Sequence, residues 1–238
     1  MQFFLHLLRH DLTRIFRDRM MWIFLLIPFL LVPFLRWGVP LLGTYWPVMR
    51  AYDVLVIGMI IPLITISPAM LTALLMLDEK DQGILDVLRV MPVSSRTFFG
   101  YRIGLLAVLG SLLGGLSLAL CGLWEYHLGH IMAISLLLAL YGPLIPLLII
   151  SLANNKIEGV TLVKAINVAM GVPVMLILLA PSWEIVSGII PFYWLYKILG
   201  AIHQGESMVM YWVAGMGTTF ALFCIAYSRF SRKVFRPD

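Results

Sequence analysis

The chain has 238 residues, of which 61% are hydrophobic and 12% are charged, and its mean hydropathy is +0.97. Soluble domains are typically about 45–50% apolar and about 25% charged, so this chain has more apolar surface than one soluble core could bury. The composition therefore excludes a water-soluble protein. It also excludes disorder, collagen-like repeats and a disulfide scaffold, because charge is low, glycine is not periodic and only two cysteines are present.

The first 20 residues carry an amphipathic pattern that precedes the long apolar segments. Phe4, Leu8, Leu12 and Ile15 recur at helical spacing, with basic residues between them. This pattern is typical of a helix that lies in the membrane interface, and it differs from that of a cleavable signal peptide. We therefore predict an interfacial helix over residues 1–20, and a docking role for this helix stays open.

Six long apolar segments follow. A membrane-crossing helix needs about 20 apolar residues, because each residue adds about 1.5 Å and the hydrocarbon core is about 30 Å thick. The predicted spans are residues 20–37, 54–77, 103–124, 130–152, 163–181 and 207–228. A shorter segment over 184–205 contains Pro191 and is interpreted as an outer re-entrant helical hairpin before the last span. The predicted fold class is an all-α polytopic membrane protein with one transmembrane domain, residues 1–238.

The basic residues predict how this topology is oriented. Fourteen of the 17 Lys and Arg residues lie on one side of the predicted spans, whereas Arg36, Arg50 and Lys197 lie on the other. The positive-inside rule then places both termini in the cytoplasm and the chain in the plasma (inner) membrane. Six of the seven Trp residues fall near the outer ends of the spans, as an aromatic belt would. The net charge of +5 is explained by topology and anionic lipid, without nucleic acid.

The spans lack the residues that an ion-coupled transporter or an ATPase would need. No ionisable residue lies at mid-depth in a predicted span, where proton or sodium coupling would place one. The sequence also contains no G-x-x-x-x-G-K-[S/T] motif, so ATP would have to bind another subunit. Gly110 and Gly114 form a G-x-x-x-G motif, which we interpret as a site of close helix packing.

A small cluster of metal-ligating residue types lies in a predicted outer loop. It consists of Glu125, His127 and His130. Zinc sites normally have three or four protein ligands, so we predict no bound metal, no cofactor and no catalytic residue in this chain. An intramembrane enzyme that uses this loop is an alternative, and it would lose activity on replacement of the two histidines by alanine.

The connection between the second and third predicted spans is the most informative segment. Acidic residues crowd its start, Leu85, Leu88 and Met91 follow at three-residue spacing, and Pro92 ends the pattern. We predict a short amphipathic helix over 78–91 at the cytoplasmic interface. Such a helix either connects two spans only or docks into a groove on a partner.

This connection resembles the corresponding loop in the membrane subunits of type-2 ATP-binding-cassette (ABC) exporters. That family has an acidic residue closing span two, a glycine four positions later, leucines and then Pro-Val-Ser. The matching residues are Glu79, Gly83, Leu85, Leu88, Pro92, Val93 and Ser94. Ile84 departs from the pattern, because the family often has threonine there. The segments at 154–159 and 181–206 also look like those of the family.

The resemblance implies a permease subunit that is not itself an enzyme. ATP and magnesium would bind a separate cytoplasmic ABC ATPase, and a second permease copy or a paralogue would complete a dimer in the membrane lipid. The helix over 78–91 would be the coupling helix that seats in the ATPase. The residues assigned to this coupling are Glu79, Lys80, Gly83, Leu85, Leu88, Arg89 and Pro92.

Individual roles follow from position in the motif. Glu79 and Arg89 would make polar contacts with the ATPase, and Leu85 and Leu88 would enter its apolar groove. Pro92 would set the exit into the third span. The glycine of the motif would allow close backbone approach.

The cargo predicted from the apolar spans and the family is a small hydrophobic or amphipathic compound, such as a drug, an antibiotic, a lipid or a peptide. The alternative function is a membrane anchor that recruits a cytoplasmic partner and transports nothing.

Overall fold

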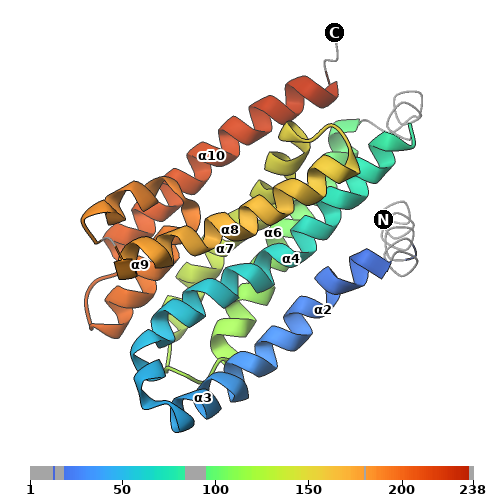
Figure 1. The fold of residues 1–238 in the computed structure, drawn as a ribbon. Coiled ribbons are helices and arrows are strands. Elements are labelled where there is room, and N and C mark those ends of the chain that lie inside the picture. Colours follow the sequence, from blue (N-terminus) through green and yellow to red (C-terminus); the bar gives the residue numbers. More distant parts are fainter. Residues whose placement is uncertain (1–12, 14–18, 84–94, 180, 236–238) are drawn as a thin grey trace.

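The computed structural model describes residue 13, residues 19–83, residues 95–179 and residues 181–235. These residues form helices joined by short turns, and no strand occurs among them (Figure 1). Six helical segments are long and apolar enough to cross a membrane, which confirms the predicted fold class. Most of the predicted interfacial helix and most of the predicted coupling helix lie outside the described residues.

The first membrane segment is a continuous helical path made of three pieces. Helix α2 (Arg19–Pro33) passes through the π-helical turn η1 (Phe34–Gly38) into α3 (Val39–Tyr45). The Val39 N–H donates to the Phe34 carbonyl, five residues back. This wider turn lies between Pro33 and Pro40, neither of which has an N–H to donate. The helical path therefore extends beyond the predicted boundary at residue 37.

Two helices form the centre of the bundle, α4 (Asp53–Asp81) and α7 (Leu128–Leu152). Both are largely buried, and they pack against each other. The short 3-10 helix η2 (Pro47–Tyr52) leads into α4. Four further helices surround the central pair; they are α2, α6 (Ser95–Leu120), α8 (Lys156–Leu179) and α10 (Val209–Phe235). Much of their apolar surface is exposed, as a lipid-facing surface requires.

Helix α4 contains two prolines and still continues unbroken. Pro68 has no N–H, so the carbonyl of Ile64, four residues earlier, loses its helical donor. The Ser67 hydroxyl donates to that carbonyl at 3.0 Å. A neighbouring serine thus supplies the missing hydrogen bond, which explains why the proline is tolerated in a buried membrane helix.

Small residues let α6 and α7 approach closely. A Cβ atom on Gly110 would lie 3.1 Å from the backbone oxygen of Leu138. One on Gly142 would collide with the backbone oxygen of Leu106, and one on Gly114 with the side chain of Leu138. The interpretation of Gly110 and Gly114 as a packing motif is therefore confirmed.

The segment before the last long helix forms two short helices, η3 (Pro181–Ile189) and α9 (Pro191–His203). Pro191 begins α9, a position at which its missing N–H costs nothing. The Tyr141 hydroxyl donates to the Pro191 carbonyl at 2.7 Å, which anchors α9 to α7. Helix α9 also packs against α4 and α10. Its re-entry into the membrane stays a prediction.

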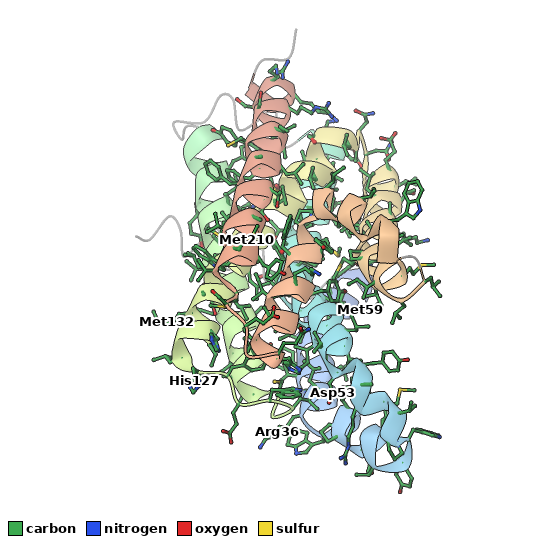
Figure 2. The ribbon with its side chains drawn as sticks, turned by 90° about the vertical axis from the view of Figure 1, so that its left-hand side faces the viewer. Arg36, Asp53, Met59, His127, Met132 and Met210 are labelled. Atoms are coloured by element: carbon green, nitrogen blue, oxygen red, sulfur yellow. The ribbon has the colours of Figure 1, made fainter. Side chains whose placement is uncertain are left out.

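The bundle has two distinct ends. Figure 2 shows Arg36, Asp53 and His127, from three different segments, toward the same end, which we call the Asp53 end. Helix α4 begins there and finishes at the opposite end, which we call the Glu79 end. Helix α10 also finishes at the Glu79 end (Figure 1).

Candidate functional site at the Glu79 end of the bundle

A buried ion pair joins the end of α4 to the start of α6. Both guanidinium Nη atoms of Arg102 donate to the Glu79 carboxylate, at 2.7 Å and 2.9 Å. Glu79 is 3% exposed and Arg102 is 4% exposed. The paired geometry satisfies both charges with directional hydrogen bonds, which is how such groups tolerate loss of water. The pair holds the two ends of the connection 78–102 together.

The end of α4 is also bonded to the start of α8. The Lys156 ammonium lies 3.4 Å from a carboxylate oxygen of Asp78, and the Lys156 backbone N–H donates to Asp81 at 2.9 Å. The side chains of Lys156 and Asp78 are each 27% exposed. Because Asp81 accepts a free N–H at the first turn of α8, it also complements the positive end of that helix.

The segment 154–159 has a structural explanation of its own. The Asn155 side chain accepts from the Glu158 N–H at 2.9 Å, and the Glu158 carboxylate accepts from the Asn154 N–H at 2.7 Å. These reciprocal bonds resemble a capping box and start α8 at Lys156. A Cβ on Gly159 would collide with Leu77, so this glycine lets α8 pack closely against α4.

Helix α10 reaches the same site through Lys233. The Lys233 ammonium donates to the carbonyl of Ala153 at 2.6 Å and to that of Ser151 at 3.3 Å. Both carbonyls lie at the end of α7, where backbone acceptors lack helical partners and a cation is favoured. Five helices, α4, α6, α7, α8 and α10, are thus linked by polar contacts within one layer.

The described coupling residues lie where α4 ends. Gly83 has a φ of +71°, a left-handed conformation that favours glycine, and its N–H donates to the Lys80 carbonyl at 3.0 Å. This bond closes the helix in the manner of a glycine cap. No described residue lies within 4 Å of a Cβ built on Gly83, so the backbone conformation explains this glycine within the described part of the chain, and its close approach to an ATPase stays a prediction. Lys80 is half-buried.

Four assigned coupling residues, Leu85, Leu88, Arg89 and Pro92, lie outside the described residues. Their docking roles stay predictions, as does a contact of Glu79 with an ATPase. In this structure the Glu79 carboxylate is turned inward, to Arg102.

Sequence reasoning missed Arg102, Lys156 and Lys233 as site residues and counted them only as positive charges. One signal was available for Arg102. It stands at the far end of the same connection as Glu79, beside a predicted span, and has the opposite charge. A hairpin between two spans brings such ends together. No comparable signal existed for Lys233, which lies about 80 residues from its acceptors.

The predicted outer loop with Glu125, His127 and His130 lies near the Asp53 end. The rings of His127 and His130 are 5.6 Å apart between centroids. Across the part of the chain that the structure describes, no group of three or more His, Cys, Asp or Glu side chains is placed to hold a metal ion.

Replacing Lys233 by methionine is expected to lower the free energy of unfolding by about 1–2 kcal/mol, because two carbonyls at the end of α7 lose a charged donor. Unfolding in mixed micelles, followed by circular dichroism, measures this loss. Arg232→Met is the matched control, since Arg232 is exposed and, among the described residues, bonds to Ser228 of its own helix. Equal effects of the two substitutions would contradict the capping role.

Comparison with known proteins gives the family. The family model described as Rv2686c-like, fluoroquinolones export permease protein Rv2686c-like, matches residues 11–227. Two curated relatives are the fluoroquinolones export permease proteins Rv2686c and MT2760 of Mycobacterium tuberculosis, from strains ATCC 25618 / H37Rv and CDC 1551 / Oshkosh. Each is 29% identical over 200 residues, covering 83% of this chain and 77% of the relative. No solved structure matches the chain. With six membrane-spanning segments and a family match over most of its length, the chain belongs to the Rv2686c-like family of fluoroquinolone export permeases.

Proposed function

We propose that this chain is the membrane subunit of an ATP-driven ABC exporter in the plasma membrane. In this proposal the Glu79 end faces the cytoplasm, together with both termini. A separate ABC ATPase binds ATP and magnesium and docks on the segment 78–91. Two permease subunits, identical or related, form the path through the membrane.

The observation that best supports this proposal is the network of polar contacts at the Glu79 end. The segment 78–91 begins on the last turn of α4, where Glu79 is bonded to α6 and Asp78 to α8. A force applied by the ATPase to that segment would therefore act on three long helices together. Because the chain has no phosphate-binding motif and no ionisable residue at mid-depth, its energy has to come from such a partner.

The proposed cargo is a small amphipathic compound of the fluoroquinolone type. The named relatives are fluoroquinolones export permease proteins, and the apolar helices of this chain suit a compound that enters from the inner leaflet. Such compounds combine a flat aromatic body with a carboxylate and a basic amine.

The test is association with the ATPase, measured by affinity purification from the native membrane after mild crosslinking. The wild-type chain is expected to retain an ABC ATPase whose ATP turnover rises when a fluoroquinolone is added. Leu88→Asp is expected to weaken that association about tenfold, because a carboxylate would have to enter an apolar groove.

Leu128→Asp is the matched control. Leu128 is 72% exposed at the Asp53 end, far from the proposed docking segment. Both variants must keep the wild-type unfolding transition. Normal ATPase binding by a folded Leu88→Asp variant would contradict docking at 78–91. The ATPase could also associate with the chain while cargo changes neither ATP turnover nor transport into vesicles. That result would favour the alternative function, a membrane anchor that transports nothing.

A further inference from the structure

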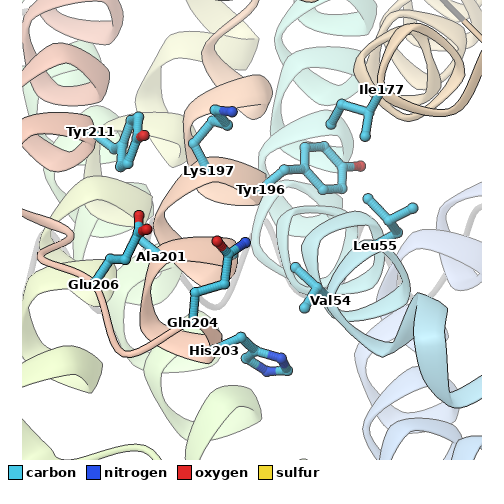
Figure 3. Close-up of a pocket in the computed structure, with 11 residues that line it drawn as sticks. Val54, Leu55, Ile177, Tyr196, Lys197, Ala201, His203, Gln204, Glu206 and Tyr211 are labelled. Carbon is cyan, nitrogen blue, oxygen red and sulfur yellow. The ribbon is translucent and has the colours of Figure 1, made fainter. Parts of the chain in front are cut away.

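A cavity lies at the Asp53 end, between the starts of α4 and α10, the end of α8, and helix α9 (Figure 3). We call it the outer cavity. Its volume is about 270 Å³, near the lower limit for pockets that hold small organic ligands. Figure 3 shows Val54, Leu55 and Ile177 on one side, with Lys197 and Glu206 on the other. One side is thus apolar, and the other carries charge of both signs.

The positive charge of the outer cavity comes from the middle of a helix whose other residues are largely buried. Lys197 lies among Leu195, Tyr196, Ile198 and Leu199, which are all buried. Charged residues are rare in such surroundings, and those that occur there commonly serve a function. The Lys197 ammonium lies 5.7 Å from the centroid of the Tyr211 ring. That position is within the range of a cation–π contact and keeps the charge at the cavity.

The negative charge comes from the turn that follows α9. Glu206 is exposed and lines the cavity. Its N–H donates to the carbonyl of Ala201 at 2.8 Å, and Gly205 before it has a φ of +71°. The turn that carries the carboxylate is therefore defined by its own backbone bond. An acid and a base at one cavity complement a ligand that carries both charges.

Aromatic rings complete the wall. Tyr196 and Tyr211 both line the cavity. Tyr196 is buried, with its ring close to Gly58 of α4 and its hydroxyl donating to the Met170 carbonyl at 3.3 Å, so the half-buried Tyr211 is the ring that offers a face to a ligand. Flat aromatic ligands pack well against such rings. A phospholipid headgroup also carries both charges, but it has no aromatic ring that could stack on Tyr211.

A histidine adds an unused polar atom. His203 lines the cavity, and its Nε2 atom is buried and finds no hydrogen-bond partner among the described residues. Its ring lies against Trp124, with centroids 3.5 Å apart. Burial lowers the pKa of His203, so the imidazole is neutral at pH 7. A buried polar atom without a partner raises the free energy of the folded state, and a hydrogen bond from a ligand or water would lower it.

We propose that the outer cavity binds zwitterionic aromatic compounds of the fluoroquinolone class. The ligand carboxylate would lie toward Lys197, its basic amine toward Glu206, and its flat ring system against Tyr211. This inference rests on the proposed function for its cargo, and it adds a site at the end of the bundle where cargo would leave.

The test is equilibrium binding of norfloxacin to the full chain in nanodiscs, without any ATPase, followed by the fluorescence anisotropy of the drug. Lys197→Gln and Glu206→Gln are each expected to weaken binding about tenfold. Arg50→Gln and Glu125→Gln are the matched controls, because these charges lie toward the same end and do not line the outer cavity. The controls are expected to leave the affinity unchanged.

A second ligand makes the assignment of charges specific. Nalidixic acid is a quinolone acid without the basic amine, so competition by it should be sensitive to Lys197→Gln and insensitive to Glu206→Gln. Glycerophosphoethanolamine, the headgroup of a zwitterionic lipid, should not displace norfloxacin. Wild-type protein that fails to bind norfloxacin, equal effects of cavity and control variants, or displacement by the lipid headgroup would each overturn the proposal.

Failure of this proposal is distinguishable from failure of the proposed function. If the cavity variants bind norfloxacin normally while Leu88→Asp still releases the ATPase, the proposed drug site is wrong and the proposed exporter function is retained. If norfloxacin binds in the outer cavity but no ATPase associates with the chain, the proposed drug site is retained and the proposed exporter function is wrong.

Discussion

Replacing Arg102 by alanine is expected to lower the free energy of unfolding by about 3–5 kcal/mol, because it takes the guanidinium away from the buried Glu79 carboxylate. Glu79 is 3% exposed, so its carboxylate would lose two hydrogen bonds at a site with little access to water. Unfolding in mixed micelles, followed by Trp fluorescence or circular dichroism, measures the loss. This is the largest effect we expect from any single substitution in the chain.

The matched control is the double variant Glu79→Met, Arg102→Met. It removes both charges and keeps apolar volume at the site, so most of the lost stability is expected to return. A double variant as unstable as Arg102→Ala would show that packing at this position, and not an unpaired charge, dominates.

The same double variant tests what Glu79 does in the proposed exporter. Because the carboxylate faces Arg102 and not the surface, we expect ATPase association within about threefold of the wild type. Complete loss of association in a stable double variant would mean that Glu79 contacts the ATPase directly, as its position in the motif implies.

Replacing Gly142 by alanine is expected to lower the free energy of unfolding by about 1–3 kcal/mol, as overpacking of a tight core does. The new Cβ would collide with the backbone oxygen of Leu106. A backbone atom cannot rotate away as a side chain can, so α6 and α7 would have to separate. In a membrane this separation is costly, because packing contacts are a main source of helix association there.

Gly104→Ala, on α6, is the control for this prediction. Gly104 is exposed, and no described residue has an atom within 4 Å of the position that its Cβ would take. Alanine favours helix over glycine by up to about 1 kcal/mol, so this variant is expected to be as stable as the wild type or slightly more stable. Equal losses for Gly104→Ala and Gly142→Ala would exclude close backbone packing as the cause.

The network of polar contacts at the Glu79 end could not be predicted from the sequence. Charge and motif position predicted a contact of Glu79 with a partner protein, which stays a prediction, and did not show that its carboxylate bonds to Arg102 of the same chain. A carboxylate beside a predicted span has the same sequence signature whether it contacts a partner protein or a residue of its own chain. Which partner it takes depends on the rotation of α4 about its axis, and one helical step of about 100° separates neighbouring residues.

The sequence by itself determined the membrane class and the number of long apolar segments. Both depend on local composition, because a helix must match about 30 Å of hydrocarbon with about 20 apolar residues wherever it lies. The G-x-x-x-G motif of Gly110 and Gly114 likewise predicted close packing, since small residues allow membrane helices to approach each other.

The tertiary structure alone decided which helices are central and which charges meet. Helices α4 and α8 have similar hydropathy, yet most of α4 is buried and little of α8 is. In lipid, both faces of a helix are apolar, so hydrophobic pattern does not distinguish a protein-facing side from a lipid-facing side. The contacts of Lys233 with Ala153 and of Lys197 with Tyr211 depend on the offset and rotation of whole helices. These are set by how side chains of distant segments fit together, which no local stretch of sequence contains.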